Sequence, residues 1–430
     1  MALTGGTRRR AGRRRALVLT DQGVSSLSNF VVTIIVARLL SSDGFGAFSV
    51  ALVAYQLATG CVRAVVGEPY LSAHSAHDTR VRTRAAADLV RAAFLTSALC
   101  SLVMLAAALV SGEAAGPLVA LACVFPFLGI QDSLRHVAVV DRPDLALASD
   151  LAWLVAVVGL LVVAPDGASA AWFVAAWGVA GAVGLAVALV TMRVPLLSGS
   201  ARRWGRTHRQ MASAFLAETV TARAMSQIIL LALGAISGLA ALGAVRAAQT
   251  FYGPLNTLFA GINMALVPDG ARQRDDPARL VRFMVGASAV VTAAAAAWAI
   301  VGVVLPDSWG TELFGSTWTD AERVMLPVGL AVVAGSANTG AFAGLRALGA
   351  ARYSLRARLM SLPPEALCAL VGALAAGAVG YSYGFALGNT FMAAIWWGFF
   401  LAAVRQRAAR RPRPEPPPVP FADPIPGSAR

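Results

Sequence analysis

Two long apolar stretches decide the fold of this chain: ALVLTDQGVSSLSNFVVTIIVARLL (residues 16–40) and FGAFSVALVAYQLATGCVRAVVGEP (residues 45–69). Each is long enough to cross the hydrocarbon core of a bilayer, which takes about 20 helical residues. Polar residues recur at helical spacing within them: Gln22, Ser26, Asn29 and Thr33 in the first, Ser49, Gln56, Thr59 and Arg63 in the second. Such spacing places them on one helix face, which we expect to line a protein interior or a watery cavity.

The composition of the whole chain is that of an integral membrane protein. Of its 430 residues, 57% are hydrophobic and only 13% are charged, which is too apolar for a soluble globular protein of this size. The net charge of +14 is carried by arginine alone, because the sequence has no lysine. These arginines are spread over alternate loops and not gathered on one soluble face, which argues against binding of nucleic acid.

Apolar stretches of spanning length occur about twelve times, near residues 16–40, 44–66, 86–110, 116–139, 145–164, 169–192, 212–234, 238–266, 281–305, 322–345, 354–380 and 383–404. The connecting loops alternate between arginine-rich and nearly arginine-free, and the loop GYSYG (380–384) is one of the bare ones. Arginine-rich loops stay on the cytoplasmic side. We therefore predict an all-α polytopic membrane protein with about 12 transmembrane helices and both termini in the cytoplasm.

This count divides the chain into five segments. We predict a basic cytoplasmic N-terminus, an N-terminal six-helix lobe, a cytoplasmic linker, a C-terminal six-helix lobe and a disordered cytoplasmic tail rich in arginine and proline. Their respective ranges are residues 1–15, 16–192, 193–211, 212–404 and 405–430.

A weak internal repeat supports the two lobes. Setting residues 45–55 over residues 242–252 matches two glycines, Gly46 and Gly243, and two tyrosines, Tyr55 and Tyr252. The same offset aligns two rare intramembrane carboxylates, Asp21 and Glu218. Because each lobe has an even number of spans, both lobes point the same way, and we expect the binding site at their interface.

Three arginines within the predicted spans are candidate anion ligands. Arg223 lies about eleven residues into its helix, near the midplane, where an arginine costs roughly 2.5–3.5 kcal/mol. Arg246 shares a face of the eighth span with Gln249 and Asn256, and Arg63 lies on the corresponding face of the second span. We predict that these side chains face one cavity and bind substrate there.

Structural roles for the same arginines stay open. Arg223 could pair with Glu218 or Asp150, and Arg63 could reach up to the cytoplasmic surface. Arg38, at the outer end of the first span, is a candidate for the mouth of the cavity or for a pair with Asp43.

Carboxylates in the spans suggest a second role, ion coupling. Asp21 and Glu218 are buried enough to be protonated near neutral pH, which suits coupling to H+ or Na+. An arginine partner or a helix cap is the structural alternative for both. Asp132 and Arg135, three residues apart on the fourth span, are expected to form an ion pair within that helix.

Signals for catalysis or for a cofactor are missing from the sequence. His74, His77 and Asp78 have a spacing that could bind a metal, but they lie in a polar loop without further ligands, so no metal site is predicted. No phosphate-binding loop, dinucleotide fingerprint or nucleophile elbow occurs. The longest outer loop spans only residues 306–321, and we predict that the protein is not an enzyme and has no cofactor.

Twelve spans in two halves, opening on the hairpin ARLLSSDGFGAFSVALVAYQLATGCVRAVVGEP (residues 37–69), resemble the MOP flippase superfamily and within it the Wzx-type polysaccharide flippases. The motif-like positions are Ala37-Arg38, Asp43 to Gly46, and Arg63 with Gly67-Glu68-Pro69. The resemblance implies a MATE-like fold in the inner, cytoplasmic cell membrane. It also implies alternating access between two lobes and a cationic cavity that grips a lipid-linked pyrophosphate sugar.

The resemblance further implies that Arg38, Arg63 and Arg246 line this cavity. It implies a role in cell-surface polysaccharide synthesis, with glycosyltransferases or a polymerase of the same pathway and membrane lipids as partners. Two other functions stay open: a MATE-type drug or cation antiporter, and a non-transporting scaffold of a glycan-synthesis complex. Cavity-directed arginines favour an anionic substrate over a cationic one.

Overall fold

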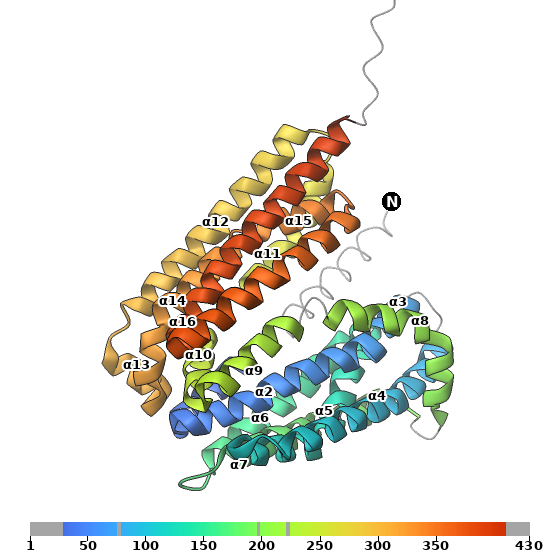
Figure 1. Ribbon diagram of the computed structural model, residues 1–430. Coiled ribbons are helices and arrows are strands. Elements are labelled where there is room, and N and C mark those ends of the chain that lie inside the picture. Colours follow the sequence, from blue (N-terminus) through green and yellow to red (C-terminus); the bar gives the residue numbers. More distant parts are fainter. Residues whose placement is uncertain (1–28, 75–78, 196–197, 221–223, 410–430) are drawn as a thin grey trace, which may run out of the picture.

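A computed structural model describes residues 29–74, 79–195, 198–220 and 224–409, which are almost entirely helical and contain no strand (Figure 1). The first group of elements consists of the helix Asn29–Leu39, α2 (Ser42–Val62), the π-helix η1 (Arg63–Gly67), α3 (Glu68–His74), α4 (Thr79–Ala108), η2 (Gly112–Ala114), α5 (Ala115–Asp141), α6 (Pro143–Val162), α7 (Ala170–Met192) and α8 (Ala201–Thr219). We call this group the N-lobe.

The second group, which we call the C-lobe, runs from α9 to α16. It consists of α9 (Met225–Ser237), α10 (Leu239–Phe251), α11 (Gly253–Arg272), α12 (Pro277–Val303), α13 (Asp307–Phe314), η5 (Gly315–Thr317), α14 (Trp318–Ser336), α15 (Thr339–Ala347) and α16 (Ala351–Ala409).

The helices form a multi-pass membrane protein. Eight helical segments of the described chain are long and apolar enough to span a membrane, and two further apolar helices, Asn29–Leu39 and Met225–Ser237, are shorter. Large apolar side chains point outward, among them Leu109, Val155 and Leu374, which are 87%, 72% and 73% exposed. An outward-facing apolar surface of this kind needs lipid around it. The exact count of twelve spans and the side of the termini stay predictions.

Some of the helices begin at a side-chain cap. Ser41 and Ser169 accept hydrogen bonds from the backbone N–H of Gly44 (3.2 Å) and Trp172 (3.3 Å) at the starts of α2 and α7. Such side chains satisfy N–H groups that the first helical turn leaves without a partner.

Two predicted spans are interrupted. The eighth span breaks at Tyr252 into α10 and α11, because Pro254 has no N–H to donate and starts the new helix. The tenth span breaks between Ser336 and Thr339 into α14 and α15.

The last hairpin turns earlier than the sequence suggested. α16 consists of two arms that fold back at Ala376 and Gly377, where Gly377 has φ 56°, a value that favours glycine. The expected loop at residues 380–384 lies instead in the second arm, and Tyr381 within it is buried. Gly372 and Gly380 touch across the hairpin with no room for a Cβ atom, so the glycines allow close helix packing here and do not form the turn.

Helix α8 crosses the predicted boundary between linker and C-lobe at residues 211 and 212. It docks on the N-lobe, because Arg203 forms an ion pair with Asp88 and the indole N–H of Trp204 donates to the carbonyl of Val65 (3.2 Å). The linker is therefore an ordered helix over most of its length.

The two lobes meet at one end of the molecule and diverge toward the other (Figure 1). At the joined end, a Cβ atom on Gly243 would lie 2.7 Å from the Ser42 carbonyl oxygen and 3.0 Å from the Gly46 backbone nitrogen. The hydroxyl of Thr317 also donates to the carbonyl of Ala37 (3.1 Å). Thus the two glycines that the internal repeat matched lie against each other between the lobes.

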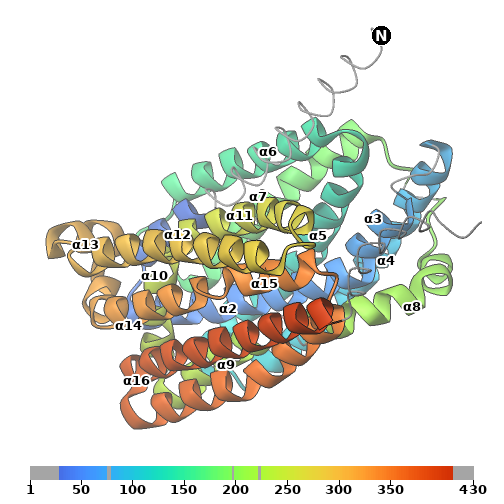
Figure 2. The ribbon, with the colours of Figure 1, turned by 90° about the horizontal axis from the view of Figure 1, so that it is seen from above.

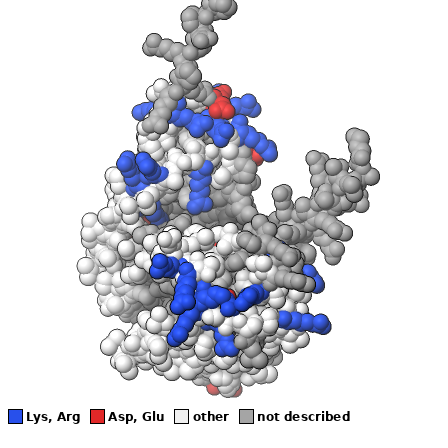
Figure 3. All heavy atoms as spheres, turned by 90° about the vertical axis from the view of Figure 1, so that its right-hand side faces the viewer, with Lys and Arg blue, Asp and Glu red and all other residues white. Residues whose placement is uncertain are grey.

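The open end is strongly basic. Figures 1 and 2 place α3 and α8 at this end and α13 at the opposite one. Figure 3, viewed onto the open end, shows arginine side chains gathered on both lobes. A cleft with this charge around its mouth attracts anions.

Candidate functional site: a two-chambered cleft

Two adjoining chambers lie between the helices of the cleft. The larger, of about 900 Å³, we call the C-lobe chamber, and the smaller, of about 530 Å³, the N-lobe chamber. Asn29, Gln56 and Gln227 line both and form their common wall. Both volumes are in the range of ligand pockets, about 300–1,000 Å³.

Arg246 supplies the charge of the C-lobe chamber. The described lining of this chamber contains Arg246 and no aspartate or glutamate. Over the described residues, no ion pair involves Arg246, and its buried Nε atom has no hydrogen-bond partner. A guanidinium taken out of water without a counter-charge is costly, so this chamber is suited to an incoming anion.

Arg246 owes its position to helix α10, one and a half turns before the break at Tyr252. Its neighbours Gln249, Thr250, Gly253 and Pro254 also line the chamber. The hydroxyl of Tyr252 donates to the Met325 carbonyl (3.0 Å) and fixes the break against α14. The break therefore brings polar side chains and a turn between two helices to the chamber wall, which is tolerated at membrane depth beside a cavity or within protein.

Polar and aromatic groups complete the C-lobe chamber. Thr33, Ser382 and Asn389 contribute polar atoms, and the amide of Asn389 donates to the Ala331 carbonyl (3.2 Å). The aromatic lining consists of Phe30, Tyr252, Phe259, Tyr381 and Phe385.

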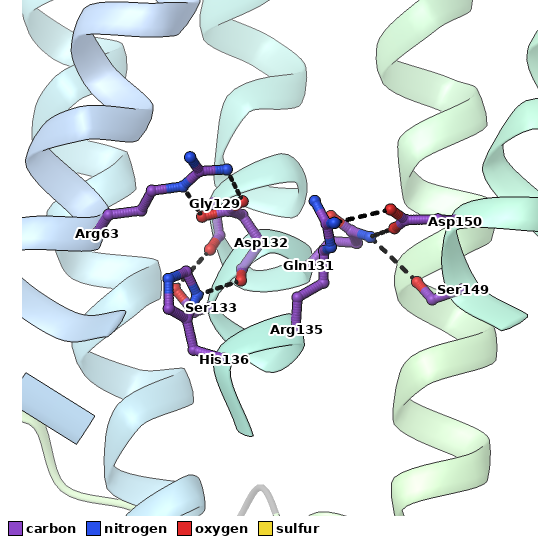
Figure 4. A network of polar contacts seen from close by, with 9 residues as sticks. All are labelled: Arg63, Gly129, Gln131, Asp132, Ser133, Arg135, His136, Ser149 and Asp150. Carbon is purple, nitrogen blue, oxygen red and sulfur yellow. Dashed lines mark hydrogen bonds and ion pairs between the residues drawn. The ribbon is translucent and has the colours of Figure 1, made fainter. Parts of the chain in front are cut away.

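Both arginines of the N-lobe chamber already have carboxylate partners (Figure 4). Arg63 donates from Nε and Nη2 to the two carboxylate oxygens of Asp132, at 2.8 and 2.6 Å. Arg135 lies 3.0 Å from the carboxylate of Asp150 on α6. The expected pair within α5, Asp132 with Arg135, is thus replaced by two pairs between helices, because the neighbouring helices bring Arg63 and Asp150 within reach. These four residues sum to no net charge.

A buried amide extends this network. The side-chain nitrogen of Gln131 donates to Ser149 and Asp150, both at 3.1 Å, and the Ser149 hydroxyl donates to the Gly184 carbonyl (2.9 Å). α5, α6 and α7 are therefore joined by charge and by hydrogen bonds behind the N-lobe chamber. Polar networks of this kind, when fully bonded, hold helices in a defined arrangement.

An aromatic wall faces the charges of the N-lobe chamber. Tyr55 and Trp153 line it, and Trp177 packs behind both, with ring centroids 4.5 Å from Tyr55 and 5.6 Å from Trp153. The indole N–H of Trp153 donates to the Trp177 carbonyl (3.2 Å), which orients its ring.

The structure places the predicted substrate-binding residues unevenly. Arg63 lines the N-lobe chamber, and Arg246 and Gln249 line the C-lobe chamber. Arg38 is exposed at the joined end, lines neither chamber and forms no ion pair with Asp43 within the described chain.

Four predicted site residues are beyond what the structure describes. Arg223 and Asp21 lie outside the described residues. Glu218 and Asn256 belong to α8 and α11, but their side chains are not among those described.

Several lining residues escaped the sequence analysis. Gln227, Ser382 and Asn389 reach the chambers from α9 and α16. Asp150, named from the sequence as a possible partner of Arg223, pairs with Arg135. Asn389 is a lone amide in an apolar span, a signal that could have identified it. Trp153 and Tyr381 give no such signal, because an aromatic residue in an apolar span is ordinary.

Comparison with known proteins connects this chain to polysaccharide biosynthesis and its fold to transporters. A family model described as "Polysaccharide biosynthesis protein" matches residues 35–323. No curated protein sequence matches the chain significantly.

Solved structures share the fold over nearly the whole chain. An inward-facing multidrug resistance MATE family transporter of the MOP superfamily is 12% identical, with a TM-score of 0.71 over 90% of this chain and 96% of the other. The lipid II flippase MurJ, in an inward closed conformation, is 9% identical, with a TM-score of 0.65 over 92% and 91%. A eukaryotic MATE transporter is 13% identical, with a TM-score of 0.58 over 93% and 99%. At these identities the likeness establishes the fold.

Proposed function

Since the chain belongs to the polysaccharide biosynthesis protein family, we propose that it flips or exports a lipid-linked pyrophosphate oligosaccharide across the cytoplasmic membrane by alternating access. The observation that carries this proposal is Arg246, which has no ion-pair partner among the described residues and lines the C-lobe chamber of a cleft that is open at its basic end.

The chemistry of the C-lobe chamber favours a diphosphate. A guanidinium offers paired N–H donors that match phosphate oxygens, and it keeps its charge when buried. Among the described residues the Nε atom of Arg246 has no hydrogen-bond partner, and Gln249, which also lines the chamber, adds an amide. Binding of an anion would replace the missing counter-charge, so part of the cost of burying Arg246 is recovered when substrate enters.

The alternative of a drug or cation antiporter fits this chamber less well. Aromatic rings of the kind that can pack on a cation do line the chamber. A cation also needs a counter-charge, however, and the described lining holds an arginine and no carboxylate. A scaffold that does not transport would gain nothing from burying a guanidinium that has no counter-charge in the described lining. Removal of Arg246 would then stabilise the fold and impair no function.

Coupling to H+ or Na+ through Asp21 and Glu218 is part of the proposal. If either carboxylate carries the ion, Asp21→Asn or Glu218→Gln abolishes ion-dependent flipping while substrate still binds. Ion dependence that is unchanged in both variants would leave these carboxylates with structural roles. Glycosyltransferases or a polymerase of the same pathway are the proposed protein partners.

Deletion of the gene provides the functional test. We expect cells without the protein to lose surface glycan and to accumulate lipid-linked glycan in the membrane, and re-expression of the wild-type chain to restore export. Unchanged surface glycan together with increased sensitivity to cationic dyes would favour the antiporter. Full restoration by Arg246→Ala at normal protein level would favour the scaffold.

Orientation is tested by cysteine labelling in a background from which the four native cysteines are removed. Ser316→Cys at the joined end should react with an impermeant thiol reagent added outside. Gly205→Cys on α8, where a new side chain meets nothing within 4 Å, should react only after the membrane is opened. The reverse pattern would place the basic open end outside the cell. It would contradict entry of the substrate into the cleft from the cytoplasmic side.

A further inference from the structure

We propose that the two chambers divide the substrate between them: the C-lobe chamber binds the diphosphate, and the N-lobe chamber is a subsite for the sugars. This inference rests on the proposed function and adds to it which lobe recognises the glycan. Its basis is the difference in charge and lining between two chambers that share a wall.

The N-lobe chamber offers little to a diphosphate. Each of its arginines is already bound to a carboxylate, Arg63 to Asp132 through two hydrogen bonds and Arg135 to Asp150. A phosphate entering here would have to displace a bidentate carboxylate or bind beside it, at a cost in repulsion. Arg246 imposes no such competition within the described lining.

The same pairing leaves donors for neutral hydroxyl groups. Arg63 uses two of its five N–H groups on Asp132, and no other hydrogen bond from its guanidinium occurs among the described residues, so three donors can serve an uncharged ligand. Its side chain is 39% exposed, whereas that of Asp132 is 5% exposed. The guanidinium therefore faces the chamber, and the carboxylate holds it from behind.

Aromatic and amide groups give this chamber the lining that a sugar requires. The C–H faces of a pyranose ring are weakly positive and pack on the electron-rich faces of aromatic rings, and Tyr55 and Trp153 supply such rings in the chamber wall. Asn29, Gln56 and Gln227 add amides that bond to hydroxyl groups as donors and acceptors. Within the described part of the chain, the Oε1 atom of Gln227 has no hydrogen-bond partner, so a hydroxyl group that donates to it would replace no existing bond.

The common wall sets the geometry of the division. Asn29, Gln56 and Gln227 border both chambers, so a diphosphate beside Arg246 and a sugar joined to it would meet across these amides. A glycan directly attached to the diphosphate can therefore occupy the neighbouring chamber.

Binding to the purified full-length chain in lipid nanodiscs tests this division with two probes. One is undecaprenyl diphosphate, which carries no sugar. The other is the pool of undecaprenyl-diphosphate-linked glycans extracted from host cells in which the gene is deleted. We expect the sugar-bearing lipid to bind the wild-type chain about tenfold more tightly. Trp153→Leu should reduce this advantage to less than about threefold and leave affinity for the sugar-free lipid unchanged.

Ala224→Phe provides a second variant that removes no existing contact of Trp153. Ala224 lines the N-lobe chamber and not the C-lobe chamber. A phenyl ring at this position would occupy the volume that we assign to the sugar. It should likewise weaken the sugar-bearing lipid selectively. The matched control is Gly335→Leu, which adds bulk to the C-lobe chamber, where the nearest atoms to a new Cβ are 3.9 Å away in Asn389, and should weaken both probes alike.

The outcomes separate the two proposals. If neither lipid binds the wild-type chain, the proposed function fails. If both lipids bind the wild-type chain equally, or if Trp153→Leu and Ala224→Phe weaken both lipids by the same factor, the division into subsites is overturned while the proposed function stands.

Discussion

The two chambers of the cleft solve the problem of buried charge in opposite ways. In the N-lobe chamber, Arg63 and Arg135 are each balanced by a carboxylate, Asp132 and Asp150. In the C-lobe chamber, Arg246 has no such partner among the described lining residues. Balanced charge contributes to the structure of the lobe, whereas unbalanced charge remains available for a ligand. An anionic ligand is thus expected to bind most strongly to Arg246, whose charge no carboxylate balances in the described lining.

Removal of the unbalanced charge should have the largest effect. Arg246→Ala is expected to abolish surface glycan at normal protein level, since loss of charge-assisted hydrogen bonds of about 1.5–3 kcal/mol weakens binding about 10- to 100-fold. Arg246→Lys should be intermediate, because an ammonium meets phosphate only as a point charge. We expect Arg223→Ala to resemble Arg246→Ala. Quantitative surface-glycan blotting checks this, and wild-type glycan from Arg246→Ala would contradict it.

Removal of the carboxylate that pairs with Arg63 should have a smaller effect, and it should strengthen diphosphate binding where loss of Arg246 weakens it. Asp132→Asn leaves Arg63 without its counter-charge, so the N-lobe chamber gains an available cation, and undecaprenyl diphosphate should bind about threefold to tenfold more tightly. The same change should cost about 1–3 kcal/mol of stability, less than for a fully buried pair because Arg63 is 39% exposed.

The control for Asp132→Asn is Asp320→Asn. Asp320 lies 3.9 Å from Arg323 in a pair whose side chains are 38% and 69% exposed, and its loss should change neither property measurably. Weaker diphosphate binding by Asp132→Asn would contradict the idea that Asp132 competes with a phosphate for Arg63.

The smallest expected effects distinguish structural from functional amides. Gln131 is buried and bonded to Ser149 and Asp150, so Gln131→Ala should cost about 1–3 kcal/mol, or a few degrees in Tm. Gln249 lines the C-lobe chamber and forms no side-chain hydrogen bond within the described part of the chain. Gln249→Ala should therefore leave Tm within about 1 °C and weaken diphosphate binding a few-fold. Thermal unfolding and diphosphate binding, measured on the same samples, check both expectations. A lower Tm in Gln249→Ala with weaker binding in Gln131→Ala would contradict them.

Much of this arrangement could be predicted from the sequence. Helical spacing of polar residues identified Asn29, Thr33, Gln56, Thr59 and Arg63, all of which line a chamber. It also identified Arg246 and Gln249, and the resemblance to the MOP flippase superfamily is confirmed by the family match and the shared fold. The predictions of polar lining residues succeeded because a polar side chain in an apolar span must face the protein interior or a watery cavity.

The pairing of charges was not predictable from spacing. Asp132 and Arg135 lie one turn apart and invited an ion pair within one helix, yet Asp132 bonds to Arg63, 69 residues away. Lateral packing of α2, α5 and α6 decides these partners, and a single sequence carries no record of it. For the same reason the sequence could not show that Arg63 and Arg246 differ in availability.

Affinity for undecaprenyl diphosphate in two variants that replace charged side chains by neutral amides tests the central claim most directly. Arg246→Gln removes the unbalanced charge, whereas the double variant Arg63→Gln/Asp132→Asn removes a balanced pair and leaves the net charge unchanged. Because Arg246 has no counter-charge in the described lining of its chamber, we expect a loss of about 10- to 100-fold in the first and less than about threefold in the second. An equal or larger loss in the double variant would contradict the claim that Arg246 binds the anion.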